Sequence, residues 1–416
     1  MTTKYLVPGL RTPFVKAGGL FAAYDTIALS MPVAQAMGRQ ARPDFAIWGQ
    51  VIPSTSVSNI ARDIVLEAGL DPEIPAFSTV MACSTSMMAT IQAASMVGQS
   101  DLHLAMVGGV ETMSRGPIAL KPEVAMKMAA ALAADPAGAA AAFSQLNLGD
   151  FALSARGWAN RISGRTMGDH TEDTVKHFGI SREDQDRIAL LSHQRAIAAQ
   201  DAGFFNDLLV PFAGVDHDMQ ARRDSTAEKL ASLKPVFDPT PTGSITAGNA
   251  SPLTDGAAGL WVADEEGLRR LGDRPAAKLV DWQIAAMDWH VEGIIMAPAR
   301  AIPKLLARQG LRFDDIDLWE IHEAFAGQVL ANVKAFSDPA YRREKAGVDA
   351  DLGEFPWERF NPNGGSLAIG HPFAATGARI IGQAVKELAA MGSGKRAIVS
   401  ICADGGEGTV LLLETP

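Results

Sequence analysis

Short apolar runs alternate with segments of helical pattern through the first quarter of the chain. The runs end at small or turn-forming residues, and the segments between them carry apolar positions at helical spacing. In chain order we expect a strand at 45–52, a helix at 59–68, a strand ending before residue 83, a helix ending at residue 98 and a strand at 102–109. Strands that alternate with helices indicate a mostly parallel sheet covered on both faces.

The last hundred residues repeat this pattern. The elements expected there, in chain order, are a strand at 317–325, a helix through 380–388, and strands at 397–401 and 409–413. His371 then stands at a strand-to-helix turn in the second half, as Cys83 does in the first. Two such turns that face each other would form one site between two similar α/β halves.

The middle of the chain does not follow this alternation. Residues 121–143 are rich in Ala and Met, and Asp169 with Glu172, and Ser181 with Asp184, have the spacing of helix capping boxes. We expect an inserted helical and loop region that lies over the sheet and carries substrate-binding residues. The expected domains are residues 1–116 completed by 250–272, the insert at 117–249, and residues 273–416.

Composition narrows the class of protein. The chain has 416 residues, of which 47% are hydrophobic and 20% charged, as in ordinary globular proteins. A formal net charge of −10 argues against nucleic acid as a partner and requires a local basic patch for any anionic ligand. No apolar leader or run of about 20 apolar residues is present, so we expect a cytoplasmic protein without a transmembrane segment.

Only two cysteines occur, Cys83 and Cys402, and each ends an apolar run. Cys83 directly precedes an expected helix, where the macrodipole and free N–H groups favour a thiolate and hence a nucleophile. The alternative is that both are inert, buried structural cysteines. A disulfide is not expected, because nothing else in the sequence indicates an oxidising compartment.

Four motifs in order give the chain a family resemblance. They are Cys83 at a strand end, His322-Glu-Ala-Phe, the Gly364-Gly-Ser-Leu-Ala-Ile-Gly-His371-Pro loop, and Cys402-Ala-Asp-Gly-Gly. The chain resembles the thiolase family, and is most similar to the 3-ketoacyl-CoA thiolases (acetyl-CoA acyltransferases) of fatty-acid β-oxidation. His322 contributes to this assignment, because many biosynthetic members carry Asn there. The resemblance implies an α/β fold of duplicated α-β-α-β-α layered halves with an inserted loop domain.

The resemblance also implies roles for individual residues. Cys83 would attack the substrate and become acylated, His371 would accept its proton, and Cys402 would act as acid and base. One oxyanion site would use His371 and a water held by His322, and the other the backbone N–H groups of Cys83 and Asp404. Relatives carry Gly or Ala in place of Asp404. Because an inward carboxylate would oppose an oxyanion, we expect its side chain to point away.

Coenzyme A is the substrate that the resemblance implies, with no tightly bound cofactor. The candidate phosphate-binding residues form a basic run, which consists of Arg222, Arg223, Lys229 and Lys234. Acidic residues interrupt this run, and the alternative interpretation is that it is only a solvated face. By family position Arg222 is the best candidate, Ser251 would contact the pantetheine arm, and Met167 and Phe325 would lie near the reacting end. No His-x-x-x-His or Cys-x-x-Cys spacing occurs, so no catalytic metal is expected.

Three functions remain open at this point. The first is thiolytic cleavage of 3-ketoacyl-CoA, or its reversal by Claisen condensation. The second is a biosynthetic acetoacetyl-CoA or sterol-carrier-type thiolase with the same chemistry. The third is a non-catalytic acyl-CoA-binding scaffold, against which the retention of Cys83, His371 and Cys402 counts. The resemblance further implies a homodimer or higher homo-oligomer, and some relatives partner a multifunctional hydratase–dehydrogenase subunit of β-oxidation.

Overall fold

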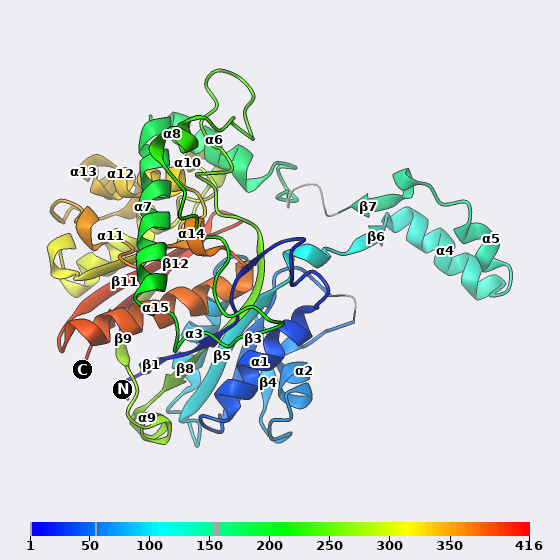
Figure 1. Ribbon diagram of the computed structural model, residues 1–416, viewed down its shortest axis with the longest axis horizontal. Coiled ribbons are helices and arrows are strands. Elements are labelled where there is room, and N and C mark those ends of the chain that lie inside the picture. The colour runs from blue at the N-terminus through cyan, green and yellow to red at the C-terminus, as the bar shows by residue number, and fades with distance from the viewer. Residues whose placement is uncertain (1, 55, 154–158) are drawn as a thin grey trace.

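A single twisted sheet runs through the computed structural model, which describes residues 2–54, 56–153 and 159–416. Within these residues the strand order is β10-β11-β12-β9-β1-β8-β5-β3-β4, with β2 paired to β8 off this path (Figure 1). The strands are β1 (Tyr5–Arg11), β2 (Val15–Lys16), β3 (Phe45–Gly49), β4 (Ala76–Phe77), β5 (Leu104–Glu111), β8 (Thr254–Ala263), β9 (Ala277–Ala286), β10 (Leu318–Ile321), β11 (Arg396–Ala403) and β12 (Glu407–Glu414).

The sheet consists of two halves that meet at β1 and β9. Only two residue pairs join these strands, Tyr5 with Lys278 and Leu6 with Ala277. The expectation of a mostly parallel sheet is wrong, because β3–β4, β3–β5 and β10–β11 are parallel whereas β1–β8, β5–β8, β9–β12 and β11–β12 are antiparallel. β11 and β12 are antiparallel because a short turn that contains Gly405 and Gly406 joins them as a hairpin.

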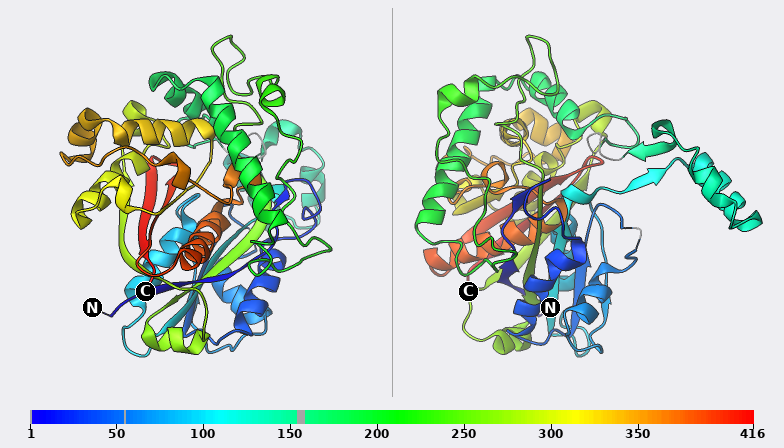
Figure 2. Two further views of the ribbon diagram at one scale, coloured as in Figure 1. Left: turned by 60° about the vertical axis from the view of Figure 1, so that its left-hand side comes forward. Right: turned by 45° about the vertical axis from the view of Figure 1, so that its right-hand side comes forward.

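Helices cover both faces of the sheet and form a central layer between the halves (Figures 1 and 2). Those of the two halves are α1 (Thr26–Gly38), α2 (Ile60–Glu67), α3 (Thr85–Met96), α9 (Glu265–Leu271), α10 (Trp289–Glu292), α11 (Pro298–Gln309), α12 (Ala326–Ser337), α13 (Pro339–Tyr341), α14 (Ser366–Ile369) and α15 (Thr376–Met391). The central pair is α3 and α15. One core cluster contains their apolar side chains together with strand residues of both halves, such as Val107 and Val399. This pair brings the turn before α3 next to the loop before α15. The prediction of a strand-to-helix turn at His371 is wrong, because this loop follows the short helix α14 and not a strand.

A close approach fixes the distance between α3 and α15. A Cβ atom on Gly377 would lie 2.5 Å from the backbone N of Met87, which is closer than real Cβ contacts allow. The backbone N of Ala378 donates to Ser86 Oγ across the same contact, at 2.8 Å. Glycine at position 377 therefore lets the two helix starts, and the turns before them, come together.

The insert divides into an arm and a covering region. The arm consists of β6 (Ile118–Leu120), α4 (Pro122–Ala134), α5 (Ala139–Phe143) and β7 (Phe151–Leu153), and it projects away from the body (Figure 2). It does not lie over the sheet as expected, and of α4 only Met128 is buried. The Ala-rich sequence gives this helix few large apolar side chains to bury against the body.

The covering region contains α6 (Met167–His177), α7 (Arg182–Asp201) and α8 (Ala227–Ala231). Ser181 caps α7 by accepting from Asp184 N, as the spacing predicts. The predicted box of Asp169 with Glu172 is wrong, because Thr166 caps α6 and Asp169 is its third residue. The Glu172 carboxylate instead accepts from the backbone N atoms of Ser244 and Ile245, which ties the following loop to α6.

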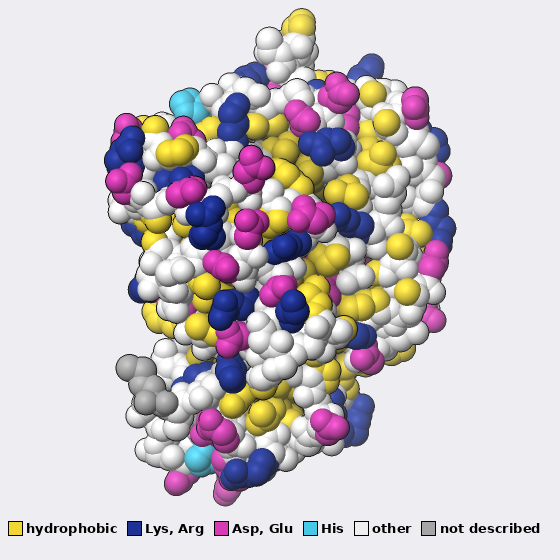
Figure 3. All heavy atoms as spheres, turned by 90° about the vertical axis from the view of Figure 1, so that its left-hand side faces the viewer, with side chains coloured by type: hydrophobic (Ala, Val, Ile, Leu, Met, Phe, Trp, Pro, Cys, Tyr) yellow, Lys and Arg dark blue, Asp and Glu magenta, His cyan; other side chains and the backbone are white. Residues whose placement is uncertain are grey.

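Two features of the whole molecule bear on its environment. Within the described residues, no helix combines the length and apolarity that crossing a bilayer requires. On the face shown in Figure 3, Lys and Arg side chains alternate with Asp and Glu and do not gather into one basic patch. That face therefore offers no extended surface for a polyanion.

Candidate active site

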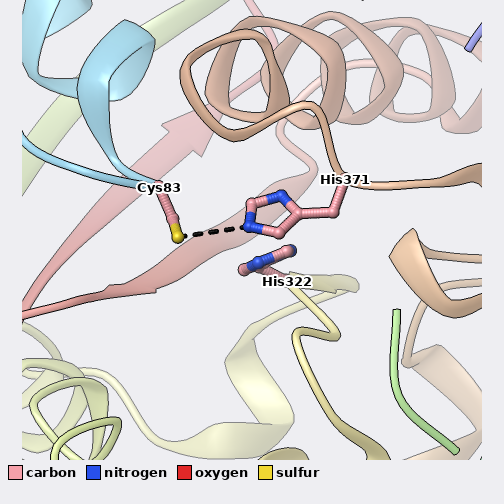
Figure 4. A group of neighbouring side chains, drawn as sticks. All are labelled: Cys83, His322 and His371. Carbon is pink, nitrogen blue, oxygen red and sulfur yellow. Dashed lines mark hydrogen bonds between the residues drawn. The ribbon is translucent and has the colours of Figure 1, made fainter. Parts of the chain in front are cut away.

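Cys83 and His371 come from turns 288 residues apart and meet between the two halves (Figure 4). The Sγ atom of Cys83 lies 3.1 Å from Nε2 of His371. Cys83 is partly exposed, whereas only 4% of the His371 surface is accessible. A thiol within hydrogen-bond distance of an imidazole is the arrangement of a nucleophile and its base.

A strained turn presents the thiol. Ala82, directly before Cys83, has a φ of 43°, in the left-handed region that non-glycine residues seldom adopt. The Thr85 hydroxyl holds this turn, since its Oγ1 accepts from Met81 N at 2.9 Å and donates to Ala82 O at 2.7 Å. Backbone strain of this kind often occurs where a catalytic side chain must be aimed.

A hydrogen bond at Nδ1, the ring nitrogen that does not contact Cys83, fixes the His371 ring. Its Nδ1 lies 2.7 Å from Thr376 Oγ1 at the start of α15, and Gly370 before it has a φ of 113°. Burial, with a contribution from the Arg379 charge, lowers the pKa of His371 to about 3. The imidazole is therefore neutral at pH 7. A proton on Nδ1, donated to Thr376, leaves the Nε2 lone pair facing Cys83.

The resting thiol is not the thiolate that the sequence predicted. Burial, followed by the charges of Cys402 and Asp404, raises the pKa of Cys83 well above its ordinary value. These effects outweigh the helix that begins at Thr85. Since Cys83 and His371 are both neutral at rest, the proton must pass to Nε2 as the sulfur attacks.

His322 lies directly beside this pair. Its ring centroid is 4.2 Å from that of His371, and its Nδ1 is 2.8 Å from Ser366 Oγ. Its Nε2 is buried and has no hydrogen-bond partner among the described residues. Burial and the neighbouring His371 lower the pKa of His322 well below its ordinary value, so this ring is neutral too. A buried polar atom without a partner indicates the position of a water or a substrate oxygen.

Cys83, His322 and His371 also form a cluster that sequence spacing could not reveal. One ligand atom from each lies within 4.8 Å of the others, and sulfur with two imidazole nitrogens is a donor set that zinc prefers. Three distant segments supply these atoms, so no short metal-binding spacing in the sequence predicts the cluster. The thiol and His371 Nε2 are already hydrogen-bonded to each other, as a nucleophile and its base require. The mechanism proposed below therefore uses these groups without a metal ion.

Cys402 lies one residue before the end of β11. It is 2% exposed and packs in an apolar cluster with Phe325 and Met167. Burial raises the pKa of Cys402 to about 12. Because charge on Cys402 contributes to the raised pKa of Cys83, the two sulfurs are within electrostatic range of each other.

The predicted contacts near the reacting end gather around Cys402. Met167 begins α6, and Phe325 precedes α12 and is buried. The backbone N of Ser251 donates to Ala324 O at 3.0 Å, and Ala250 forms a β-bridge with Phe325. The structure thus brings Met167, Ser251 and Phe325 to one wall of the site.

Arg222 lies on the exposed loop between α7 and α8. Its backbone N donates to His193 Nδ1 at 3.2 Å. Of the other residues in the predicted basic run, Arg223 pairs with Asp201 and Lys229 with Asp224, whereas Lys234 forms no ion pair among the described residues. Among the described residues, the guanidinium of Arg222 forms no ion pair, so it is available to an anionic ligand.

Two hydrogen bonds fix the Asp404 side chain, but its charge still acts on the Cys83 thiol. Its Oδ1 accepts from Asn160 Nδ2 at 2.8 Å and from Gly405 N at 2.7 Å. Its charge nevertheless contributes to the raised pKa of the Cys83 thiol. Asn160 therefore directs the carboxylate without removing its field from the site.

Sequence reasoning missed the residues that support the two histidines. Thr376, Ser366 and Arg379 follow the His371 motif closely in sequence or belong to it. Nothing in their spacing shows that Thr376 contacts His371, that Ser366 contacts His322, or that Arg379 contacts Ser366. In the sequence, Glu323 stands out only as part of the His322-Glu-Ala-Phe motif. Its carboxylate accepts from Ser192 Oγ, Asn361 Nδ2 and Leu367 N, and so fastens that loop to the His322 strand.

Comparison with known proteins gives matches over nearly the whole chain. The family models described as thiolase N-terminal and C-terminal domains match residues 5–266 and 273–415. The 3-ketoacyl-CoA thiolase of Yersinia enterocolitica is 36% identical over 98% of this chain and 96% of its own length, and that of Yersinia pestis 37% identical with the same coverage.

Solved structures give the same result. An acetyl-CoA acetyltransferase of Bacillus anthracis is 32% identical, with a TM-score of 0.82 over 100% of this chain and 99% of the other. Human mitochondrial 3-ketoacyl-CoA thiolase in complex with CoA is 29% identical, with a TM-score of 0.81 over 100% and 98% of the two chains. The α/β fold class and the family resemblance predicted from the sequence are confirmed.

Proposed function

The chain belongs to the thiolase family, and we propose that it is a 3-ketoacyl-CoA thiolase, an acetyl-CoA C-acyltransferase of fatty-acid β-oxidation. The observation that carries this proposal is the 3.1 Å contact of Cys83 Sγ with His371 Nε2, beside the unpartnered Nε2 of His322. A nucleophile, its base and a place for an oxyanion are the groups that cleavage of a 3-ketoacyl thioester needs.

The first half-reaction breaks a carbon–carbon bond. Cys83 Sγ attacks the 3-keto carbon while its proton passes to His371 Nε2. The bond between C2 and C3 then breaks, which leaves the acyl group on Cys83 and a carbanion on acetyl-CoA. The Cys402 thiol protonates that carbanion. A pKa of about 12 suits Cys402 to this step, because it stays protonated until a strong base forms beside it.

The second half-reaction restores the enzyme. The Cys402 thiolate removes the proton from an incoming CoA thiol, whose sulfur attacks the acyl carbon on Cys83. The Cys83 sulfur leaves and takes back the proton from His371. His322 Nε2, through a water, and His371 stabilise one oxyanion, and the backbone N–H groups of Cys83 and Asp404 the other. Run backwards, the same steps perform a Claisen condensation.

Coenzyme A binding is assigned to residues of the covering region together with Ser251 and Phe325, which lie outside it. Arg222 meets the phosphates, Ser251 contacts the pantetheine arm, and Met167 and Phe325 flank the thioester. The unpaired guanidinium of Arg222 and the gathering of the other three residues at Cys402 support this assignment. The proposed domains are residues 1–116 with 250–272, the CoA-binding insert at 117–249, and residues 273–416. The boundary at residue 273 is supported by the family matches, of which the first ends at residue 266 and the second begins at residue 273.

A homodimer or higher homo-oligomer completes the proposal. The strand β4 is an edge of the sheet, with Phe77 and Val80 exposed beside it, and the arm exposes Met126 and Leu148. A multifunctional β-oxidation subunit is a further partner, and two free thiols that the reaction must keep reduced favour the cytoplasm. Light scattering, which gives the mass of the particle in solution, tests the oligomer.

A second candidate is a biosynthetic acetoacetyl-CoA thiolase. The similarity to the Bacillus anthracis acetyl-CoA acetyltransferase favours it, because the overall fit is as good as that to the human enzyme. Cleavage rates on acetoacetyl-CoA and 3-ketohexadecanoyl-CoA separate the two. A clear preference for the longer substrate supports β-oxidation, and activity on the four-carbon substrate alone supports biosynthesis.

Mass spectrometry of the trapped enzyme tests the reaction itself. The protein is mixed with 3-ketohexadecanoyl-CoA without free CoA, quenched in acid and digested. We expect the 14-carbon acyl group on the peptide that contains Cys83, and no adduct in a Cys83→Ala variant. An adduct on Cys402 would overturn the proposal. So would the absence of any adduct together with no release of acetyl-CoA into the solution.

A further inference from the structure

Ser366 connects His322 to a buried arginine. Nη2 of Arg379 donates to Ser366 Oγ at 2.7 Å, and the same Oγ is 2.8 Å from His322 Nδ1. All three side chains are at least 97% buried, with Arg379 on α15 and Ser366 on α14. Arg379 touches neither Cys83 nor His371 in any hydrogen bond of the described residues, so it can act only through this chain of contacts or through its charge.

Counting protons along this chain fixes their direction. A guanidinium has only N–H groups, so Ser366 Oγ must accept from Arg379. The hydroxyl has one proton of its own, and His322 Nδ1 is its only other hydrogen-bond partner among the described residues. The oxygen could accept from both Arg379 and Nδ1, but the hydroxyl proton would then be buried without an acceptor among the described residues. Donation to Nδ1 gives that proton an acceptor, so Ser366 donates to Nδ1. Because the His322 ring is neutral and carries a single N–H, that proton must be on Nε2.

The two neighbouring imidazoles then have opposite tautomers. As the base proposed above, His371 would carry its proton on Nδ1, donated to Thr376 Oγ1, and turn a lone pair toward Cys83. His322 instead carries its N–H on Nε2, and a ring nitrogen of His322 lies within 4.8 Å of the Cys83 sulfur and of a His371 nitrogen. This N–H is the buried polar atom that has no partner. It also removes His322 as a zinc ligand, because ligation requires a lone pair on Nε2.

We propose that Arg379, acting through Ser366, holds His322 in the tautomer with its proton on Nε2, and that both are positioning residues for the oxyanion site. The catalytic part of this assignment rests on the thiolase reaction proposed above. An N–H donor beside the reacting carbonyl, directly or through one water, stabilises negative charge that a lone pair would repel. Without Ser366, nothing in the contacts of His322 distinguishes its two nitrogens.

Nitrogen NMR tests the tautomer without reference to activity. In protein labelled with ¹⁵N-histidine, the shift of each ring nitrogen tells whether it carries a proton, and the His322 signals are those lost in His322→Asn. We expect a protonated Nε2 and an unprotonated Nδ1 in the wild type, and a mixture of tautomers in Ser366→Ala. A proton on Nδ1 in the wild type would overturn the proposal.

Kinetics test the consequence. We expect kcat of Ser366→Ala to fall about 10- to 100-fold with KM for CoA unchanged, since one oxyanion donor is impaired and the CoA contacts are not. Ser366→Thr keeps the hydroxyl and should recover most of the loss. Ser400→Ala is the matched control, because this buried hydroxyl near His322 has no hydrogen-bond partner among the described residues.

The outcomes separate the two proposals. Equal losses in Ser366→Ala and Ser400→Ala, with a His322 tautomer that does not change, would reduce Ser366 to a packing role and overturn the inference. A wild-type protein without thiolase activity but with a protonated His322 Nε2 that depends on Ser366 would instead overturn the proposed function. It would leave the hydrogen-bond relay standing.

Discussion

The ring of His322 lies 4.2 Å from the ring of His371, at an interplanar angle of 50°. Nε2 of His371 contacts Cys83 Sγ, and a ring nitrogen of His322 lies within 4.8 Å of that sulfur. A serine hydroxyl contacts Nδ1 of one ring and a threonine hydroxyl contacts Nδ1 of the other. Both rings are neutral at pH 7, because burial lowers the pKa of each. Two chemically identical side chains can thus take different parts in one reaction.

The pH dependence of acylation follows from these pKa values. His371, with a pKa lowered to about 3 by burial, stays unprotonated far below the usual range of histidine. We expect kcat/KM for 3-ketoacyl-CoA to be level from about pH 5 to pH 8, without an acid limb near the ordinary histidine value of about 6.5. A stopped-flow pH series measures this, and a fall centred near pH 6.5 would contradict a desolvated base.

The same shift affects folding stability. Unfolded His371 binds a proton near the ordinary value, about 6.5, whereas the folded protein does so only near 3. The unfolded state therefore holds more protons between these values, and this residue's contribution to stability is lost as pH falls through that window. Urea denaturation at pH 7 and pH 5 should show a smaller loss for His371→Asn than for the wild type.

Cys402→Ala should separate the two thiols. We expect cleavage of 3-ketoacyl-CoA to fall by about 10²- to 10⁴-fold, since the acid that protonates the departing carbanion is gone. Alkylation of Cys83 by iodoacetamide should persist, because Cys83 and His371 remain in contact. Rates of cleavage and of alkylation measure the two effects. Unchanged cleavage would remove Cys402 from the acid–base role.

Charge reversal at Arg222 tests the CoA assignment. Arg222→Glu should raise KM for CoA about tenfold with little change in kcat, since a phosphate contact contributes to binding and not to the chemical step. Arg223→Glu makes the same charge change one residue away, where the native guanidinium is paired with Asp201. Equal effects in both variants would indicate a general field and not a contact.

Two glycines on α15 predict opposite effects on stability. Gly377→Ala should destabilise the protein by about 1 to 3 kcal/mol, because the added Cβ meets the backbone of Met87 at 2.5 Å. Gly382→Ala on the same helix meets nothing closer than 3.9 Å and should stabilise it by up to about 1 kcal/mol through helix propensity. Denaturant unfolding of both variants measures the difference, and a neutral Gly377→Ala would show that the two helices can move apart.

Asp404→Asn should make Cys83 more reactive. The Asp404 charge contributes to the raised pKa of the Cys83 thiol, so its removal increases the thiolate fraction at a given pH. We expect alkylation by iodoacetamide at pH 8 to be a few-fold faster, on the order of 2 to 10 times. Asp216→Asn, whose carboxylate is exposed and pairs with His217, is the control and should alkylate as the wild type does.

Some of the site could be predicted because its chemistry is local. Cys83 and His371 each stand at a turn before a helix, and Cys402 stands near the end of an apolar strand, so neighbouring residues define all three positions. The arm was harder to place, because an alanine-rich helix has the same local pattern whether it covers the body or projects from it. The mixed sheet was missed because strand direction depends on which distant strands pair.

The sequence by itself predicted the candidate reacting groups, through the motifs that carry the family resemblance, and the order of the two halves, through the periods of strand and helix, which are properties of neighbouring residues. Only the tertiary structure decided that thiol and imidazole meet at 3.1 Å as neutral groups, and which hydroxyl holds each histidine ring. The physical reason is that protonation state and tautomer depend on desolvation and on hydrogen bonds from segments far along the chain, which exist only once the halves have packed together.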